Sequence, residues 1–382
     1  MTLARFATKN AFRNRRRSFL TAVSISFSLF LLTILMSFYR GVYLDKGSVE
    51  SQLRVVTRHK VSLVFSLPGY YREKVRAIPG VVHVSPWNWF GGLYKDDKPE
   101  NLCFQFAVDP KEIFQVLTDF KVPPDQLQAF QHDRAGAAVA RPLAEKHKWK
   151  LGDHIVIKGT IYPVNPELTI RALFDPPSTF DGMFFDREYL EQAVARAKDR
   201  VGTLYTLVDS PDHVAQVSQT IDRMFENSPE PTKTESEKAF GLSFLASVGN
   251  VKLFILSICS AVVFTILLVS GNTMAMTIRE RTREVAVLKT LGFTQGRILS
   301  LYVGEAITIS LIGGFLGNVA ASLVIVAISK LPFAGFFPIS KPTLGVLGAG
   351  LLVAALVGFI STIVPAYNAS RKNIVEGLRH IG

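Results

Sequence analysis

The feature that most constrains this chain is a set of four long apolar segments. An α-helix rises about 1.5 Å per residue, so roughly 20 apolar residues cross a hydrocarbon core about 30 Å thick. Three of the segments contain no charged residue, and the third in order contains only Glu305, near its start. Each segment therefore predicts a transmembrane helix. The apolar segments are 19–38, 253–278, 298–328 and 344–364.

The composition indicates that only part of the chain lies in a bilayer. Its mean hydropathy of +0.25 over 382 residues is high for a soluble domain and low for a chain that is all membrane. The first apolar segment is too long for a secretory signal, whose apolar region has about 7–15 residues. We therefore expect an α-helical membrane protein with four transmembrane helices and a large mixed α/β extracytoplasmic domain between helices 1 and 2. The expected layout is a cytoplasmic amphipathic segment at 1–18, transmembrane helices at 19–40, 251–278, 298–329 and 343–366, the extracytoplasmic domain at 41–250, a cytoplasmic linker at 279–297, an external loop at 330–342 and a cytoplasmic tail at 367–382.

Basic residues predict the orientation in the membrane, because they are enriched in cytoplasmic flanks. They are dense before the first helix, in the 279–297 linker and in the tail, whereas the 330–342 loop has only Lys330 and Lys341. Both termini and the linker should be cytoplasmic. The net charge of +12 then has a topological cause, and we expect no nucleic-acid partner.

The extracytoplasmic domain shows short apolar or alternating runs typical of strands, mixed with helical spacing. Strand–helix units near both ends of the domain make its middle, about 109–200, look like an inserted lobe. The predicted strands are 61–65, 81–84, 102–108, 154–157, 168–174 and 204–208, and the predicted helices are 70–78, 142–148, 186–197 and 212–225, the last with a buried stripe of Val214, Val217, Ile221, Met224 and Phe225.

Residues with catalytic or ligand-binding chemistry form no recognisable site. The seven histidines are scattered and lack an HExxH motif, so no metal site is expected. A GxSxG nucleophile motif is also missing, so we expect a non-catalytic chain. Trp87 and Trp89 alternate as in a strand and should share one face, against the core or a partner domain; binding of an acyl chain or sugar is the alternative.

The linker between helices 2 and 3 carries a short amphipathic helix. Val285, Leu288 and Leu291 recur every three residues and share a face, and Gly292 supplies a stop. Taken alone, this pattern is typical of a helix that lies on the membrane surface with its basic residues at the headgroups.

The residues of this linker also carry a family resemblance. The run Arg283-Glu-Val-Ala-Val-Leu-Lys-Thr-Leu-Gly292, followed by Ile298 and Glu305, closely resembles the coupling segment of the MacB/FtsX/LolCE-type ABC transporter permeases. In that family this helix docks on an ATP-binding subunit. The resemblance implies a coupling interface made of Arg283, Glu284, Val285, Leu288, Lys289, Leu291 and Gly292.

Weaker motifs extend the resemblance along the chain. Segments 78–82, 140–144 and 151–157 look like the family's periplasmic core domain. The C-terminal run at 365–379 looks like a second signature, although Ile374 stands where the family usually has proline.

The third helix contains two further candidate positions. Gly313 and Gly317 form a small-xxx-small surface for close helix packing. Glu305 would be costly in contact with lipid, so it should lie at the cytoplasmic interface or against protein. It is either an interfacial acid solvated by water or a switching contact.

The resemblance implies a permease subunit that holds no cofactor itself. The sequence has no GxxxxGK[ST] motif, so ATP and Mg should be bound by a separate ABC ATP-binding subunit. Further implied partners are a second permease copy or paralogue, a periplasmic adaptor and an outer-membrane channel, in a bacterial cytoplasmic (inner) membrane. ATP hydrolysis would move the external domain for export or extraction of a peptide, antibiotic or lipoprotein. Two alternatives remain: an FtsX-like regulator that activates a cell-wall hydrolase, although such regulators usually have smaller external domains, and a sensor or membrane-anchored enzyme.

Overall fold

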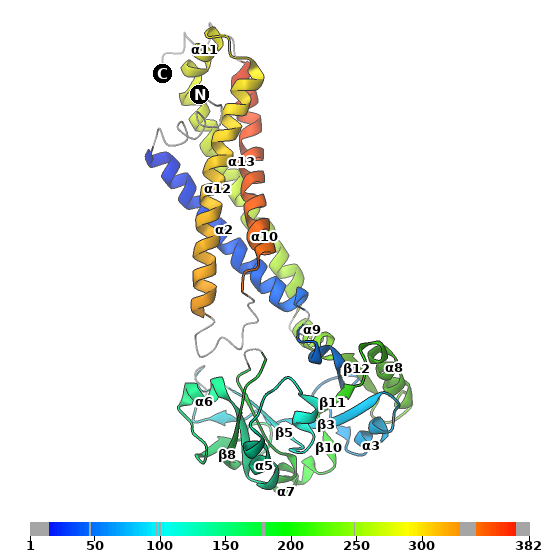
Figure 1. The fold of residues 1–382 in the computed structure, drawn as a ribbon. Helices are drawn as coiled ribbons and strands as arrows, with labels where there is room; N and C mark the ends of the chain where they lie inside the picture. Colours follow the sequence, from blue (N-terminus) through cyan, green and yellow to red (C-terminus); the bar gives the residue numbers. More distant parts are fainter. Residues whose placement is uncertain are drawn as a thin grey trace. The chain divides into compact units, whose positions relative to one another are not determined.

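The computed structural model describes residues 15–45, 47–96, 98, 101, 103–177, 180–247, 249–328 and 341–371. The chain divides into two compact units, one with the long helices and one with residues 45–249. The two units are shown in Figure 1 and are described separately below. Most of the predicted 1–18 segment, nearly all of the 330–342 loop and the tail beyond Arg371 lie outside the described residues.

The helical unit confirms the four predicted transmembrane helices. Each is long and apolar enough to cross a membrane, and they lie side by side in Figure 1. The first helix continues into a π-helical turn at Arg40–Leu44. The helices are α2 (Arg15–Tyr39), α10 (Val251–Glu280), α12 (Gln295–Ile328) and α13 (Leu344–Arg371).

The helices pack through an apolar core with hydrogen bonds across it. Ile25, Leu29 and Ile309 are buried together in this core. The Thr33 hydroxyl donates to Asn318 Oδ1 at 2.7 Å, and Asn318 Nδ2 donates to the Leu347 carbonyl at 3.0 Å. Because lipid offers no hydrogen-bond partners, such bonds hold α2, α12 and α13 in one arrangement.

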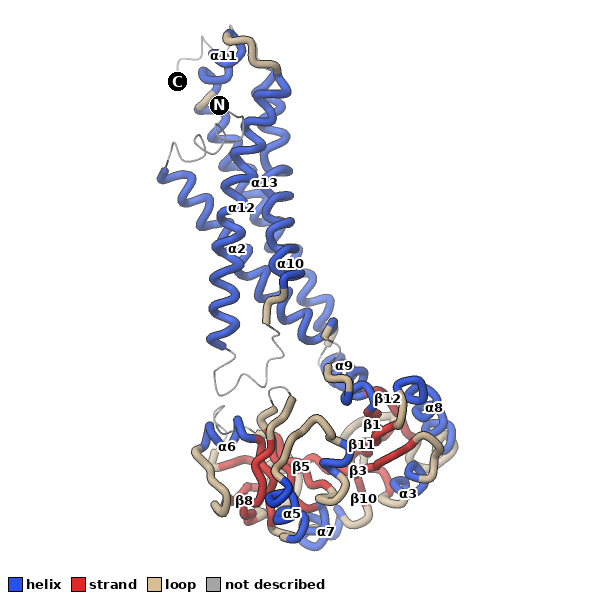
Figure 2. Tube along the Cα trace, in the orientation of Figure 1, coloured by secondary structure: helices blue, strands red, loops and turns tan. Residues whose placement is uncertain are grey.

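The second unit is built on a 10-stranded sheet in the order β12-β1-β11-β3-β5-β9-β6-β8-β7-β4. Most neighbours are antiparallel, whereas β5–β9 and β6–β8 are parallel. Figure 2 shows the strands gathered in this unit. The strands are β1 (Arg54–His59), β3 (Val81–Trp89), β4 (Leu93–Tyr94), β5 (Phe104–Val108), β6 (Gly136–Ala140), β7 (His154–Lys158), β8 (Glu167–Phe174), β9 (Gly182–Asp186), β11 (Thr203–Val208) and β12 (Thr232–Ser236), with a separate pair, β2 (Leu67–Pro68) and β10 (Arg200–Val201).

Helices cover parts of this sheet because each has an apolar face. In α8 the side chains of Val217 and Ile221, one turn apart, are buried. The N-terminus of α7 is capped by Asp186, whose side chain accepts a hydrogen bond from the Glu188 amide at 2.7 Å. The helices are α3 (Tyr71–Arg76), α4 (Ile113–Val116), α5 (Pro124–His132), α6 (Arg141–His147), α7 (Arg187–Ala193), α8 (Val214–Met224) and α9 (Glu237–Ser247).

Two apolar cores divide the sheet domain into two lobes. The terminal lobe is formed by both ends of the domain, and its core includes Val55, Tyr71 and Leu204. The central lobe has a core drawn from residues 87–197, including Phe130 and Phe184. The sheet runs through both lobes, and an inserted lobe at 109–200 stays a prediction.

One predicted strand is wrong. Residues 61–65 form a turn, and the strand lies earlier, at β1. The Val61 amide donates to His59 Nδ1 at 3.2 Å and the Val64 amide to Ser62 Oγ at 3.2 Å. These bonds to local side chains replace the ladder that a strand would need. The apolar run in the sequence therefore marked the wrong segment.

Other expectations are confirmed in part. The predicted strands at 81–84, 154–157, 168–174 and 204–208 lie within β3, β7, β8 and β11, although β3 continues to Trp89. The stripe of α8 is wrong at Met224, which is 45% exposed. Trp87 is buried and stacks on Tyr205 with 3.9 Å between ring centroids, whereas Trp89 is 53% exposed. Only Trp87 therefore faces the core.

Candidate coupling site

The predicted amphipathic linker helix is α11 (Thr282–Thr290), between α10 and α12. Its inner face consists of Thr282, Val285 and Ala286, all buried. Val285 belongs to an apolar cluster, and Leu288 packs partly against it. The other buried members of this cluster are Ile278, Ile298, Tyr302, Ala366 and Ala369, so α11 is packed against the ends of α10, α12 and α13.

The end of α11 is set by a glycine. Gly292 has a φ of +87°, a conformation that side chains rarely adopt. Its amide donates to the Lys289 carbonyl at 3.0 Å, and the Phe293 amide donates to the Leu288 carbonyl at 3.0 Å. These bonds satisfy carbonyls that the helix end leaves open. The helix is therefore short and sharply ended.

The outer face of α11 carries an exposed stripe. Arg283, Val287 and Leu291 recur every four residues, and Val287 and Leu291 are 45% and 70% exposed. Val285 is only 2% exposed. The three residues predicted to share one apolar face are therefore divided, with Val285 inside, Leu288 half-buried and Leu291 outside.

The remaining predicted interface residues, Glu284 and Lys289, are half-buried. The sequence could not separate the two faces of α11, because Val285 and Leu288 on one side and Val287 and Leu291 on the other are equally apolar. Whether this surface couples to an ATP-binding subunit stays a prediction.

A buried ion pair joins the start of α11 to α12. Arg281 Nη1 donates to both carboxylate oxygens of Glu305, at 3.0 and 2.8 Å. The side chain of Glu305 is 4% exposed and that of Arg281 is 12% exposed. Glu305 therefore faces a basic partner inside the protein, and its interpretation as an acid solvated by water or as a switching contact stays a prediction. Sequence reasoning missed Arg281 as the partner, although acids within membrane spans commonly pair with another ionisable residue.

A small cavity of about 40 Å³ adjoins this ion pair, large enough for a water molecule. Hydroxyl groups and the ion pair supply the polar part of its wall, and apolar side chains such as Met274 and Ile309 supply the rest. It is lined by Ser18, Thr21, Thr273, Met274, Thr277, Glu280, Arg281, Glu305 and Ile309.

The glycines of α12 lie where this helix touches α2. A Cβ atom at Gly313 would come within 2.8 Å of the Ala22 carbonyl oxygen. At Gly317 it would come within 2.4 Å of the Ser26 carbonyl oxygen. Only glycine permits this approach, so the two helix backbones are in direct contact.

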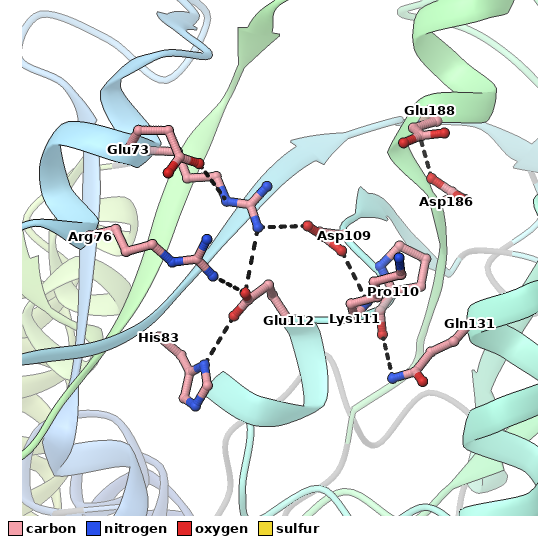
Figure 3. A network of polar contacts seen from close by, with 11 residues as sticks. Glu73, Arg76, His83, Asp109, Pro110, Lys111, Glu112, Gln131, Asp186 and Glu188 are labelled. Carbon is pink, nitrogen blue, oxygen red and sulfur yellow. Dashed lines mark hydrogen bonds and ion pairs between the residues drawn. The ribbon is translucent and has the colours of Figure 1, made fainter.

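The sheet domain contains an ionic network where its two lobes meet. Arg72 of α3 donates to Asp109 at 2.7 Å, and His83 Nδ1 lies 3.1 Å from Glu112, which also pairs with Arg76. Figure 3 shows Asp109 and Glu112 directed toward α3. The terminal lobe thus holds the segment that leads into α4 of the central lobe. Within the described residues, no group of three His, Cys, Asp or Glu side chains could hold a metal ion.

The described residues contain four helices long and apolar enough to span a membrane, a short packed helix between the second and third, and an α/β domain between the first and second, which is the architecture of a multi-pass membrane protein. The family of the MacB-like periplasmic core domain matches residues 18–224, and that of the FtsX-like permease C-terminal domain matches residues 253–374. The chain belongs to the ABC transporter permeases that combine these two domains.

Proteins of similar sequence are described as ABC transporter permeases or as a fused ATP-binding/permease protein. An uncharacterized ABC transporter permease, MJ1507 of Methanocaldococcus jannaschii, is 22% identical over 98% of this chain and 96% of its own length. The uncharacterized ABC transporter permease YknZ of Bacillus subtilis is 31% identical over 35% of this chain and 34% of its own length. The macrolide export ATP-binding/permease protein MacB of Rhodopirellula baltica is 27% identical over 48% of this chain and 27% of its own length. The chain thus spans about a third or less of the last two proteins.

Two solved structures of external domains are similar to part of this chain. The extracellular domain of the noncanonic ABC-type transporter YknZ is 12% identical, with a TM-score of 0.36 over 48% of this chain and 99% of that one. The periplasmic region of MacB from Actinobacillus actinomycetemcomitans is 8% identical, with a TM-score of 0.38 over 52% of this chain and 96% of that one.

Proposed function

We propose that this chain is the transport permease subunit of an ABC assembly, and that it converts ATP hydrolysis on a separate subunit into movement of its external domain. The movement would export or extract a peptide, antibiotic or lipoprotein on the extracytoplasmic side. In this proposal the chain lies in the bacterial cytoplasmic (inner) membrane, with its termini and α11 on the cytoplasmic side. A second permease copy or paralogue completes the assembly, and a periplasmic adaptor and outer-membrane channel extend it.

The observation that carries this proposal is the two-sided character of α11. Its inner residue Val285 is buried against three membrane helices, whereas Val287 and Leu291 present apolar surface outward. A helix that served only to close a turn would not need an exposed apolar stripe beside Arg283. Such a stripe with a flanking charge is suited to a protein partner. In our proposal the partner is the ATP-binding subunit.

Contacts within the bundle supply a route for the movement. Arg281 ties the start of α11 to Glu305 of α12, and Gly313 and Gly317 of α12 lie against α2. The chain of α11 is also directly continuous with α10. Because α2 and α10 are the helices that lead in sequence to residues 45–249, displacement of α11 would reach both connections of the external domain.

Two identical substitutions on opposite faces of α11 test the proposal. Residues 285 and 287 differ by about 200° around the helix. Val287→Ala, especially combined with Leu291→Ala, should leave the chain folded but weaken binding of the ATP-binding subunit by about 2 kcal/mol, roughly thirtyfold in affinity. Val285→Ala should instead destabilise the packing of α11 by about 1–2 kcal/mol. The measurements are co-purification with the ATP-binding subunit, membrane abundance and ATP turnover of the complex.

Wild-type assembly and ATP turnover of the Val287→Ala/Leu291→Ala variant, at normal abundance, would contradict a coupling role for the exposed stripe. An intact complex that turns over ATP but moves no substrate, and whose loss impairs cell-wall cleavage, would favour the FtsX-like regulator. Charge reversal at Lys150 or Lys158 in the external domain is the control and should leave the assembly unchanged.

A further inference from the structure

Arg54, the first residue of β1, is among the largest side chains that the described residues bury completely, with 2% of its surface exposed. A guanidinium cannot shed its charge, so burying it is costly unless every donor direction is used. The proposed function so far gives this residue no role. Its surroundings therefore require an explanation.

The Arg54 guanidinium is shared between two carboxylates. Its Nε donates to Glu237 Oε2 at 2.6 Å. Its Nη1 and Nη2 donate to Asp119 Oδ1 and Oδ2 at 2.6 and 3.2 Å. Ser48 Oγ donates to Asp119 Oδ2 at 2.6 Å and fixes that carboxylate. Only arginine has a planar group that can hold one carboxylate in a bidentate manner and a second through Nε.

The three charged residues come from three different parts of the domain. Arg54 opens β1, and residues 40–53 connect it to the end of α2. Glu237 opens α9, and residues 248–250 connect α9 to α10. Asp119 follows α4 in the central lobe, between Leu117, which is buried in the central core, and the half-buried Phe120, which packs against that core. One guanidinium therefore contacts the incoming end of the domain, its outgoing end and its central lobe.

We propose that Arg54, with Asp119 and Glu237, is the transmission joint of the external domain. It fastens the two segments that lead to the membrane helices to each other and to the central lobe, so that all three move together. This inference rests on the proposed function only because the proposed function supplies the source of the movement. The rigid connection itself is a property of the chain without ATP or any partner.

The ionic network around Arg72 makes this role separable from folding. It attaches the terminal lobe to the central lobe through Asp109 and Glu112, residues that the joint does not use. Loss of the Arg54 joint should therefore free α9 from the central lobe without separating the lobes. Arg72→Lys serves as the matched control, because it changes another arginine that bridges the same two lobes.

The joint can be tested by distances between spin labels in the full-length chain in nanodiscs. Labels at Ala129 on α5 and Ala246 on α9 report on the connection across the joint, since both positions are exposed. Labels at Ala129 and Ala193 report on the central lobe alone. Both pairs are introduced with Cys103→Ala and Cys259→Ala, which remove the native thiols.

We expect a single narrow distance between positions 129 and 246 in the otherwise unchanged chain. Arg54→Lys keeps the positive charge but cannot hold both carboxylates, so it should lose this narrow peak while the 129–193 distance stays unchanged. Asp119→Asn, which removes the charge of the bidentate partner in the central lobe, should do the same, and Arg72→Lys should not. A narrow 129–246 peak in Arg54→Lys would overturn the proposal. Broadening of both distances would also overturn it, because Arg54 would then serve general stability.

A second measurement keeps this inference distinct from the proposed function. In the complex with its ATP-binding subunit, addition of ATP should move the labels at positions 129 and 246 relative to a label on α10. In the Arg54→Lys chain the label at position 246 should still move, whereas the label at position 129 should not. If ATP moves no label in any variant but the narrow peak still depends on Arg54, the proposed function fails and the joint stands. If ATP moves position 129 equally in the wild-type and Arg54→Lys chains, the joint fails and the proposed function stands.

Discussion

The membrane bundle and the external domain each bury an arginine, but they neutralise it differently. In the bundle, Arg281 meets one carboxylate, Glu305, through two hydrogen bonds from a single nitrogen. In the external domain, Arg54 meets two carboxylates on separate elements. The first arrangement has no net charge and is made or lost as a whole. The second has one carboxylate in excess, so it can lose one contact and keep the other.

The two carboxylates around Arg54 are also unequal. Burial raises the pKa of Glu237, and the charge and hydrogen bond of Arg54 offset this only in part. Burial acts in the same direction on Asp119, but the hydrogen bonds from Arg54 and Ser48 outweigh it and bring the pKa below its ordinary value. The contact to α9 should therefore be the weaker one. This difference suits a contact that holds a moving segment, whereas the bundle pair suits a fixed one.

The largest effect is expected from breaking the bundle pair. Arg281→Met leaves Glu305 as a buried charge without compensation, which should cost about 3–5 kcal/mol. The double variant Arg281→Met/Glu305→Leu removes both charges and should recover most of this stability, yet remain impaired in ATP-coupled movement. The readouts are the temperature at which monodisperse chain is lost in detergent and the ATP turnover of the complex. A single variant as stable as the wild type would show that the pair is dispensable.

A smaller effect is expected from pH, and it separates the two contacts of Arg54. Because its folded pKa is raised, Glu237 adds stability below its ordinary value of 4.5, and this contribution is lost as the pH rises through the folded pKa. Asp119 has a lowered folded pKa, so its contribution is present above 3.8 and is lost as the pH falls through the folded pKa. Acidification should thus weaken the contact to Asp119, whereas the Glu237 contact to α9 is retained.

This order can be followed by the 129–246 label distance, which should stay narrow while Glu237 takes up its proton and broaden only below pH 3.8, where Asp119 loses its contribution. Asp119→Asn should already show at neutral pH the broad distribution that the unchanged chain shows only in acid. Tyr205, which also faces this pair, has a pKa raised by burial and does not titrate in this range. A distance that responds equally to pH in both chains would assign the effect to another group.

The smallest effect is expected from an exposed pair. Arg141 donates to both oxygens of Asp175, at 2.6 and 3.1 Å, but the two side chains are 41% and 53% exposed. Water screens such pairs, so Asp175→Asn should cost no more than about 1 kcal/mol and less still in high salt. Thermal unfolding followed by tryptophan fluorescence suits this test, because all three tryptophans lie in the external domain. If Asp175→Asn lost as much stability as Arg281→Met, burial could not explain why the two ion pairs differ in their contribution to stability.

Much of the membrane part could be predicted from the sequence, because length and apolarity alone define a spanning helix. Fewer elements of the external domain could be predicted. Strand β6 reads Gly-Ala-Ala-Val-Ala, whose small residues are buried on both faces and give no alternation. Strand β1 includes Arg54, Thr57 and His59, polar residues whose burial depends on partners elsewhere. Tertiary contacts override local pattern at both strands.

The candidate sites show the same limit. Glu305 was noticeable because a charge inside an apolar run is rare, but Arg281 was one basic residue among several in a polar linker. Arg54 gave no signal, since its partners lie 65 and 183 residues away in the chain. In α11, helical spacing identified two apolar stripes without indicating which one the rest of the chain would cover. Sequence patterns report local geometry, whereas these choices depend on packing.

The position of β1 in the sheet also affects how the chain assembles as it is made. Its neighbours are β11 and β12, with Arg54 opposite Leu207 and Val55 opposite Ser236. Strands β5, β6, β8 and β9 of the central lobe are all complete by Asp186. The stretches of chain between these strands are shorter than the stretch between β1 and its partners β11 and β12, so closing them costs less entropy. The central lobe can therefore fold while β1 still lacks both partners. The first strand synthesised is therefore among the last to pair, and the domain closes only when its final strand has emerged.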